Sequence, residues 1–246
     1  MNVSLHRIQA ESNGVAVLEY EPRRPRNVTL VVGHGYSSSK HNLDFLCNFL
    51  ASHGFAVFSL DFPGHKLGAS GGRLHGIDDL IDAMGATVAF ARSRYDGPVY
   101  LMGHSMGAMT ALFTAAADRS IAGTIAITTG YGRPTAIDTL QRKGPSTSSG
   151  QARADFRSSY VDGIALLDLV AGVDERFAQA LPRLAGRPQL YIAARRDAMV
   201  SPRSVEDLYE RAHAPKDFLI IDSDHTYAGD NARGEVLQWL NARHPR

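Results

Sequence analysis

The sequence predicts an α/β protein with a doubly wound, mostly parallel sheet. Short runs rich in valine, isoleucine and leucine alternate with longer segments in which apolar residues recur at helical spacing. Such runs are typical of parallel strands buried on both faces, and the alternation is typical of helices that cover both sides of one sheet. The chain has 246 residues, of which 44% are hydrophobic, enough for one domain of this kind. We therefore expect residues 1–246 to form a single domain.

Each strand is predicted from a short apolar run, and each helix from an amphipathic or alanine-rich stretch that follows it. Strands are expected at 15–20, 28–33, 56–60, 99–103, 123–128, 189–193 and 217–222. Helices are expected near 41–52, 77–95, 106–117, 174–185, 202–212 and 233–242. The stretch VSLHRIQA near the start adds a candidate antiparallel edge strand.

One long segment interrupts the alternation of predicted strands and helices. About 60 residues separate the strand that ends near Thr128 from the strand that begins at Gln189, far more than the usual connections in α/β units. The gap contains a polar stretch, QRKGPSTSSGQARADF, followed by the more apolar VDGIALLDLVAG. We interpret residues 131–170 as a small cap or lid over the carboxyl edge of the sheet. The alternative is a disordered surface excursion.

Composition narrows the range of partners and compartments. The 26 basic and 25 acidic residues nearly cancel, which argues against a nucleic-acid partner. The N-terminus lacks the pattern of a secretory signal, and no apolar stretch reaches the roughly 18 residues of a membrane span. Cys47 is the only cysteine, so an internal disulfide is excluded and the thiol is read as a buried small hydrophobe. We expect a cytoplasmic protein, and a homodimer is left open.

Ser105 is the candidate nucleophile. It lies at the centre of Gly103-His104-Ser105-Met106-Gly107, between a predicted strand and a predicted alanine-rich helix. A serine in a sharp strand-to-helix turn brings the residues two positions before and after it close together, and glycines avoid the collision. The alternative is a surface turn in which Ser105 caps the helix.

A serine hydroxyl needs a base, which is usually a histidine oriented by a carboxylate. The histidines near or beyond the last two predicted strands are His213, His225 and His244. His225 follows the final strand directly, where a loop at the carboxyl edge would place it over Ser105. His213 is expected at the opposite edge, and His244 in the C-terminal tail.

The orienting acid is expected after the strand at 189–193, and Asp197 stands four positions beyond it. A turn aspartate that makes only local hydrogen bonds would have the same sequence. Asp222 and Asp224, close to His225 in sequence, and Asp138, after the strand that ends near Thr128, are rival candidates.

An oxyanion hole requires two backbone N–H donors near the nucleophile. One is expected from Met106, the residue after Ser105. The other is expected from Tyr36 in the stretch GHGYSSSK, where Gly33 and Gly35 permit a tight turn. The alternative is a plain turn after a strand, and the Tyr36 side chain could instead line an acyl pocket.

Taken in order, GHGYSSSK, DFPGHKLGASGG, GHSMG, RRDAMVSP and DSDHTY resemble an α/β-hydrolase of the monoacylglycerol lipase, lysophospholipase and serine aminopeptidase-like group. The resemblance runs from about residue 15 to 242, excluding the cap. It implies Ser105 as nucleophile, His225 as general base and acid, and Asp197 as orienting carboxylate. It also implies that the amides of Tyr36 and Met106 bind the oxyanion.

The sequence departs from the family pattern in two places. The loop DFPGHKLGAS has extra residues before Ser70, and its Asp61 and His65 could be a second acid–base pair, a metal site or a structural turn. The cap is shorter than is common in the lipases, which suggests an open site for small or exposed acyl groups.

These observations predict a serine hydrolase that acts through an acyl-enzyme, with no metal and no organic cofactor. A carboxylesterase for short or medium acyl esters, or for aryl esters such as hydroxycinnamates, is the first expectation. A thioesterase, amidase or peptidase would use the same residues. A cofactorless lyase or carbon–carbon hydrolase, and a non-catalytic small-ligand receptor, are the more distant alternatives.

Overall fold

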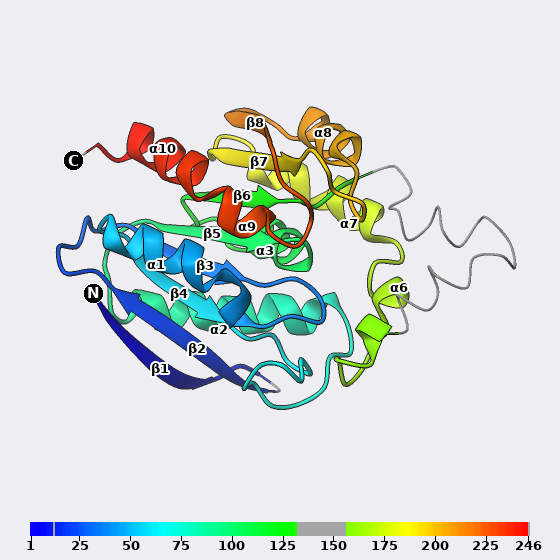
Figure 1. Ribbon diagram of the computed structural model, residues 1–246, viewed down its shortest axis with the longest axis horizontal. Helices are drawn as coiled ribbons and strands as arrows, with labels where there is room; N and C mark the ends of the chain where they lie inside the picture. The colour runs from blue at the N-terminus through cyan, green and yellow to red at the C-terminus, as the bar shows by residue number, and fades with distance from the viewer. Residues whose placement is uncertain (12, 132–155, 246) are drawn as a thin grey trace, which may run out of the picture.

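The computed structural model describes residues 1–11, 13–131 and 156–245, and in these ranges eight strands form one sheet. The strands are β1 (Asn2–Gln9), β2 (Gly14–Glu21), β3 (Thr29–Gly33), β4 (Ala56–Leu60), β5 (Val99–His104), β6 (Gly123–Ile127), β7 (Gln189–Ala194) and β8 (Lys216–Ile221). Their order across the sheet is β1-β2-β4-β3-β5-β6-β7-β8, from the lower edge to the upper edge of Figure 1. β1 pairs with β2, and β2 with β4, in antiparallel orientation. The six strands from β3 to β8 are parallel to one another.

Helices cover both faces of the sheet. The longer ones are α1 (Asp44–Ser52), α2 (Ile77–Arg92), α3 (Met106–Ala117), α7 (Val173–Ala180), α8 (Pro202–Arg211) and α10 (Arg233–Arg243). The short ones are η1 (Lys40–Leu43), α6 (Leu166–Leu169), η2 (Leu181–Leu184) and α9 (Ala228–Asn231). One apolar core joins the sheet to α2, α3, α7 and α8, and a second joins the opposite face to α1, α9 and α10.

The two cores explain why the strands are continuous apolar runs. In β3, Val31 belongs to the first core, whereas its neighbours Leu30 and Val32 belong to the second. Because successive side chains of a strand point to opposite faces, a strand covered on both sides needs apolar residues at every position. The predicted doubly wound, mostly parallel sheet is therefore confirmed, including the antiparallel edge strand β1.

The boundaries differ from expectation at a few ends. The strand predicted to reach 128 ends at Ile127, because Thr128 has a φ of 52° and leaves the extended conformation. The helix predicted at 174–185 is divided into α7 and η2, because Pro182 has no N–H to continue α-helical bonding. The helix predicted at 77–95 ends at Arg92.

Most of the predicted cap, residues 132–155, lies outside the described residues. The described part of the predicted cap, residues 156–170, packs on the loop after β4. The Asp162 N–H donates to the Gly64 carbonyl at 2.8 Å, and the Ile164 N–H donates to the Leu74 carbonyl at 2.7 Å. The cap and the single-domain organisation stay predictions. Among the described residues, no helix combines the length and the apolar character that a membrane crossing requires.

Candidate active site

Ser105 occupies the sharp turn between β5 and α3, with φ 54° and ψ −116°. A Cβ added at Gly103 would lie 2.2 Å from the backbone C and O atoms of Gly107. A Cβ added at Gly107 would lie 2.1 Å from the carbonyl oxygen of Gly33, at the end of β3. Both distances are far inside van der Waals contact, so this turn requires both glycines.

The Ser105 side chain makes no capping hydrogen bond to α3. Its backbone N–H donates to the Ile127 carbonyl at 2.8 Å, which holds the turn against the end of β6. The Oγ atom instead lies 3.1 Å from Nε2 of His225. The hydroxyl is therefore directed at an imidazole, and the helix-cap interpretation is wrong.

His225 links Ser105 to Asp197. Its Nδ1 lies 2.7 Å from Oδ2 of Asp197, whose side chain is fully buried. The other oxygen of Asp197, Oδ1, accepts the N–H groups of Met199 at 2.7 Å and Val200 at 2.8 Å. Since a carboxylate only accepts, Nδ1 of His225 is the donor, and Nε2 is left with the lone pair that faces Ser105.

The rival residues lie elsewhere. Nε2 of His244 lies 2.9 Å from the hydroxyl of Tyr100, near the start of β5, and His213 is exposed between α8 and β8. Asp222 pairs with Arg196 on the surface, and Asp224 accepts the Tyr227 N–H. The remaining rival, Asp138, lies outside the described residues.

The loop that contains Tyr36 lies against the serine turn. A Cβ added at Gly35 would lie 3.6 Å from Cβ of Ser105. Met106 is the first residue of α3, so its N–H has no acceptor within the helix. The Tyr36 hydroxyl donates to the Ile164 carbonyl at 2.9 Å. That bond joins the Tyr36 side chain to the described part of the predicted cap.

Comparison with known proteins identifies the family of the chain. Residues 30–244 match the model of the Alpha/beta hydrolase family. The chain belongs to that family. A search of curated proteins found no match to this hydrolase.

Solved structures similar to this hydrolase include several enzymes. A bacterial membrane phospholipase A described as a virulence factor is 18% identical, with a TM-score of 0.72, and the match covers 99% of this chain and 87% of that one. A thermophilic esterase from Thermogutta terrifontis is 20% identical, with a TM-score of 0.69 and coverage of 98% and 99%. A Xanthomonas campestris α/β serine hydrolase described as having no lid is 19% identical, with a TM-score of 0.69 and coverage of 100% and 97%. At these identities the likeness is one of fold.

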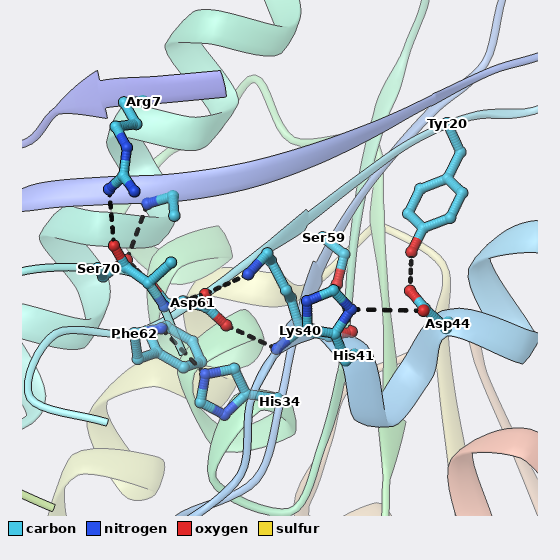
Figure 2. A network of polar contacts seen from close by, with 12 residues as sticks. Arg7, Tyr20, His34, Lys40, His41, Asp44, Ser59, Asp61, Phe62 and Ser70 are labelled. Atoms are coloured by element: carbon cyan, nitrogen blue, oxygen red, sulfur yellow. Dashed lines mark hydrogen bonds and ion pairs between the residues drawn. The ribbon is translucent and has the colours of Figure 1, made fainter. Parts of the chain in front are cut away.

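A buried ion pair supports the loop of this hydrolase that carries Tyr36. Lys40 Nζ lies 2.5 Å from Oδ2 of Asp61, and the Lys40 N–H donates to Oδ1 at 2.7 Å. The Ala69 N–H donates to Oδ2 at 2.7 Å. Burial by itself raises the pKa of Asp61, but the hydrogen bonds from Lys40 and Ala69 outweigh it and hold that pKa below its usual value. Figure 2 shows the Asp61 carboxylate beside Lys40, with dashed lines to its side-chain and backbone nitrogens.

Two imidazoles complete this cluster. His34 donates from Nδ1 to the Gly35 carbonyl at 2.8 Å and accepts the Phe62 N–H on Nε2 at 3.0 Å. Burial, with the charge of a protonated His65, lowers the pKa of His34 to about 3, so the ring is neutral and joins the loops after β3 and β4. His65 donates from Nδ1 to the Pro63 carbonyl at 3.0 Å. Asp61 thus pairs with Lys40 rather than with His65.

The geometry favours the structural-turn interpretation of Asp61 and His65 over a second acid–base pair. Within the described part of the chain, no group of three His, Cys, Asp or Glu side chains is arranged to hold a metal ion. Lys40 has no motif that would have marked it as the partner of Asp61, because 21 residues separate the two in sequence.

Proposed function

We propose that this α/β hydrolase cleaves carboxylic esters through an acyl-enzyme formed on Ser105. The observation that carries the proposal is the continuous line of two hydrogen bonds from Ser105 Oγ through His225 to Asp197, at 3.1 and 2.7 Å. Three loops after three different parallel strands supply these groups. This is the arrangement that activates a serine hydroxyl near neutral pH.

In the acylation step, Ser105 Oγ attacks the ester carbonyl carbon and its proton passes to Nε2 of His225. Asp197 stays ionised and stabilises the imidazolium through the bond to Nδ1. The carbon–oxygen bond to the leaving group then breaks, and Nε2 returns the proton to the departing alcohol. In deacylation a water molecule gives a proton to the same nitrogen while its oxygen attacks the acyl carbon. The bond from that carbon to Ser105 Oγ then breaks, and Nε2 returns the proton to Oγ, which releases the acid and regenerates Ser105.

The oxyanion of each tetrahedral intermediate is assigned to the N–H groups of Met106 and Tyr36. The N-terminus of α3 adds a partial positive charge at the position of that oxygen. Donors of this kind are preorganised, and removing one typically lowers kcat by about 10²- to 10³-fold. Two observations support the assignment: Met106 directly follows Ser105, and Gly35, the residue before Tyr36, lies against Ser105.

For the substrate we propose short or medium acyl esters, or aryl esters such as hydroxycinnamates, and kinship with the monoacylglycerol lipase and lysophospholipase group. An esterase and a phospholipase A are among the proteins of similar fold. Thioesters, amides and carbon–carbon bonds beside a carbonyl are other substrates for the same three side chains. The substrate class is therefore decided by assay.

The test combines labelling with a substrate series. A serine-reactive phosphonate should modify Ser105, as mapped by mass spectrometry, and the labelled protein should lose its activity. Hydrolysis of p-nitrophenyl esters of increasing chain length should be lost in Ser105→Ala, and matched thioester and amide series should be slower. Labelling at another residue, or full activity of Ser105→Ala, would show that the proposal is wrong.

A further inference from the structure

His104 stands in the serine turn but has no part in the proton transfer described above. It is the last residue of β5 and directly precedes Ser105. Its Nε2 lies 2.7 Å from the main-chain carbonyl oxygen of His225, and the two imidazole rings have centroids 4.8 Å apart. Because a carbonyl only accepts, Nε2 of His104 carries the proton and donates it.

We propose that His104 is a positioning residue that fixes the main chain of His225 so that the imidazole faces Ser105. This inference rests on the proposed function of His225 as the base. The ring of His225 is hydrogen-bonded to Asp197 at Nδ1 and to Ser105 at Nε2, but both of these bonds are made by the side chain and neither holds the main chain of the residue. The bond from His104 to the carbonyl supplies a second point of attachment, on the backbone.

The surroundings of His225 show why a second attachment matters. His225 lies in the loop between β8 and α9, where the side chains of Ser223 and Asp224 bond to the same loop and to α9. The Ser223 carbonyl accepts the Arg196 N–H, from the loop after β7, at 2.8 Å, so these bonds attach the loop on the side away from the serine turn. The hydrogen bond from His104 joins this loop directly to the residue beside the nucleophile. A shift of about 1 Å in a catalytic group can cost about 10²-fold in rate.

His104 also lies beside the loop that supplies Tyr36. With the proton on Nε2, Nδ1 is an acceptor, and a Cβ added at Gly35 would lie 3.2 Å from it. Burial, followed by the charge of a protonated His225, lowers the pKa of His104 to about 3, so its ring stays neutral and keeps this single donor near neutral pH. The His104 side chain is thus bonded to the loop that carries His225 and lies beside the loop that carries Tyr36, and His104 directly precedes Ser105 in the chain.

The experiment compares His104→Gln with His104→Asn and His104→Leu. The Gln amide nitrogen can occupy the position of Nε2 and donate to the His225 carbonyl, whereas the Asn side chain is too short and Leu has no donor. His213→Gln, an exposed histidine outside the site, is the control. The measurements are kcat and KM on a p-nitrophenyl ester, the rate of phosphonate labelling of Ser105, and the urea midpoint of unfolding.

We expect His104→Asn and His104→Leu to lower kcat and the labelling rate together by about 10- to 100-fold, with KM changed less than about 2-fold. His104→Gln should recover most of both rates, and His213→Gln should match the wild type. Equal losses in the Gln and Asn variants, or full activity in Asn and Leu, would overturn the positioning role. If His104→Leu does not fold, the comparison of His104→Gln with His104→Asn still tests the positioning role, because both variants keep a polar side chain.

The two proposals fail differently. If Ser105→Ala keeps the activity and the phosphonate labels another residue, the proposed function is wrong. If Ser105→Ala is inactive and labelling is lost, but His104→Asn is as fast as the wild type, only the positioning role of His104 is wrong.

Discussion

Asp197 Oδ2 and His225 Nδ1 lie 2.7 Å apart, although 28 residues separate them in sequence. Asp197 is itself held by two backbone N–H groups on its other oxygen, so the carboxylate reaches His225 from a fixed position. The imidazole is therefore held in the tautomer that leaves Nε2 free to accept the Ser105 proton.

Asp197→Asn should lower kcat by about 10⁴-fold, because an amide can donate to Nδ1 and thereby favours the wrong tautomer of His225. Asp222→Asn, Asp224→Asn and Asp138→Asn should stay near the wild-type rate. The measurement is kcat on a p-nitrophenyl ester for all four variants. If Asp197→Asn is active and Asp138→Asn is inactive, the orienting acid is Asp138 and not Asp197.

Gly103→Ala and Gly107→Ala should both destabilise the fold strongly, because the new methyl groups would overlap backbone atoms at 2.2 and 2.1 Å. Gly85, in the middle of α2, is the matched control, since a Cβ there meets no atom within 4 Å. Gly85→Ala should stabilise the protein by about 0.5–1 kcal/mol. Urea unfolding measures all three, and a neutral Gly103→Ala would contradict the packing of the turn.

Lys40→Met should reduce the free energy of unfolding by about 3–5 kcal/mol, because it leaves the carboxylate of Asp61 buried without its cation. The side chains of Lys40 and Asp61 are 3% and 0% exposed. Arg92→Met breaks the partly exposed pair with Asp118 and should cost much less. The loss is measured by urea unfolding at pH 7, and equal effects of the two substitutions would show that burial of the Lys40 pair adds nothing.

The free energy of unfolding should fall as the pH is lowered from about 6.5. The pKa values of His34 and His104 are lowered by burial from 6.5 to about 3, so between these values the unfolded chain binds protons that the folded chain does not. Each histidine then contributes a slope of up to about 1.4 kcal/mol per pH unit.

This slope is measured by urea unfolding between pH 7 and 5, above the range in which most carboxylates titrate. His104→Gln should make the slope shallower, because one of the two imidazoles whose pKa is lowered to about 3 is removed. Asp61 acts at lower pH: its pKa is held below the usual 3.8, so its contribution is present above that value and disappears as the pH falls further. A stability that does not change between pH 7 and 5 would contradict neutral buried histidines.

Local patterns were sufficient to predict the strands and the positions of Ser105, Asp197 and His225. Parallel strands buried on both faces must be apolar at every position, which makes each strand visible as a run. The loops that follow such strands all open at one edge of the sheet, so three residues in three of these loops could be expected to meet. Their roles in catalysis stay predictions until the substitutions are made.

The contacts that support the site depended on tertiary structure. The pairing of Lys40 with Asp61 and the bond from His104 to the His225 carbonyl join residues 21 and 121 positions apart. Every residue has a main-chain carbonyl, so the sequence does not indicate which one accepts a given hydrogen bond. The sequence likewise does not distinguish a buried lysine from a surface lysine. These contacts form only when loops are brought together by the sheet, because hydrogen bonds and ion pairs act over a few ångströms in space regardless of distance along the chain.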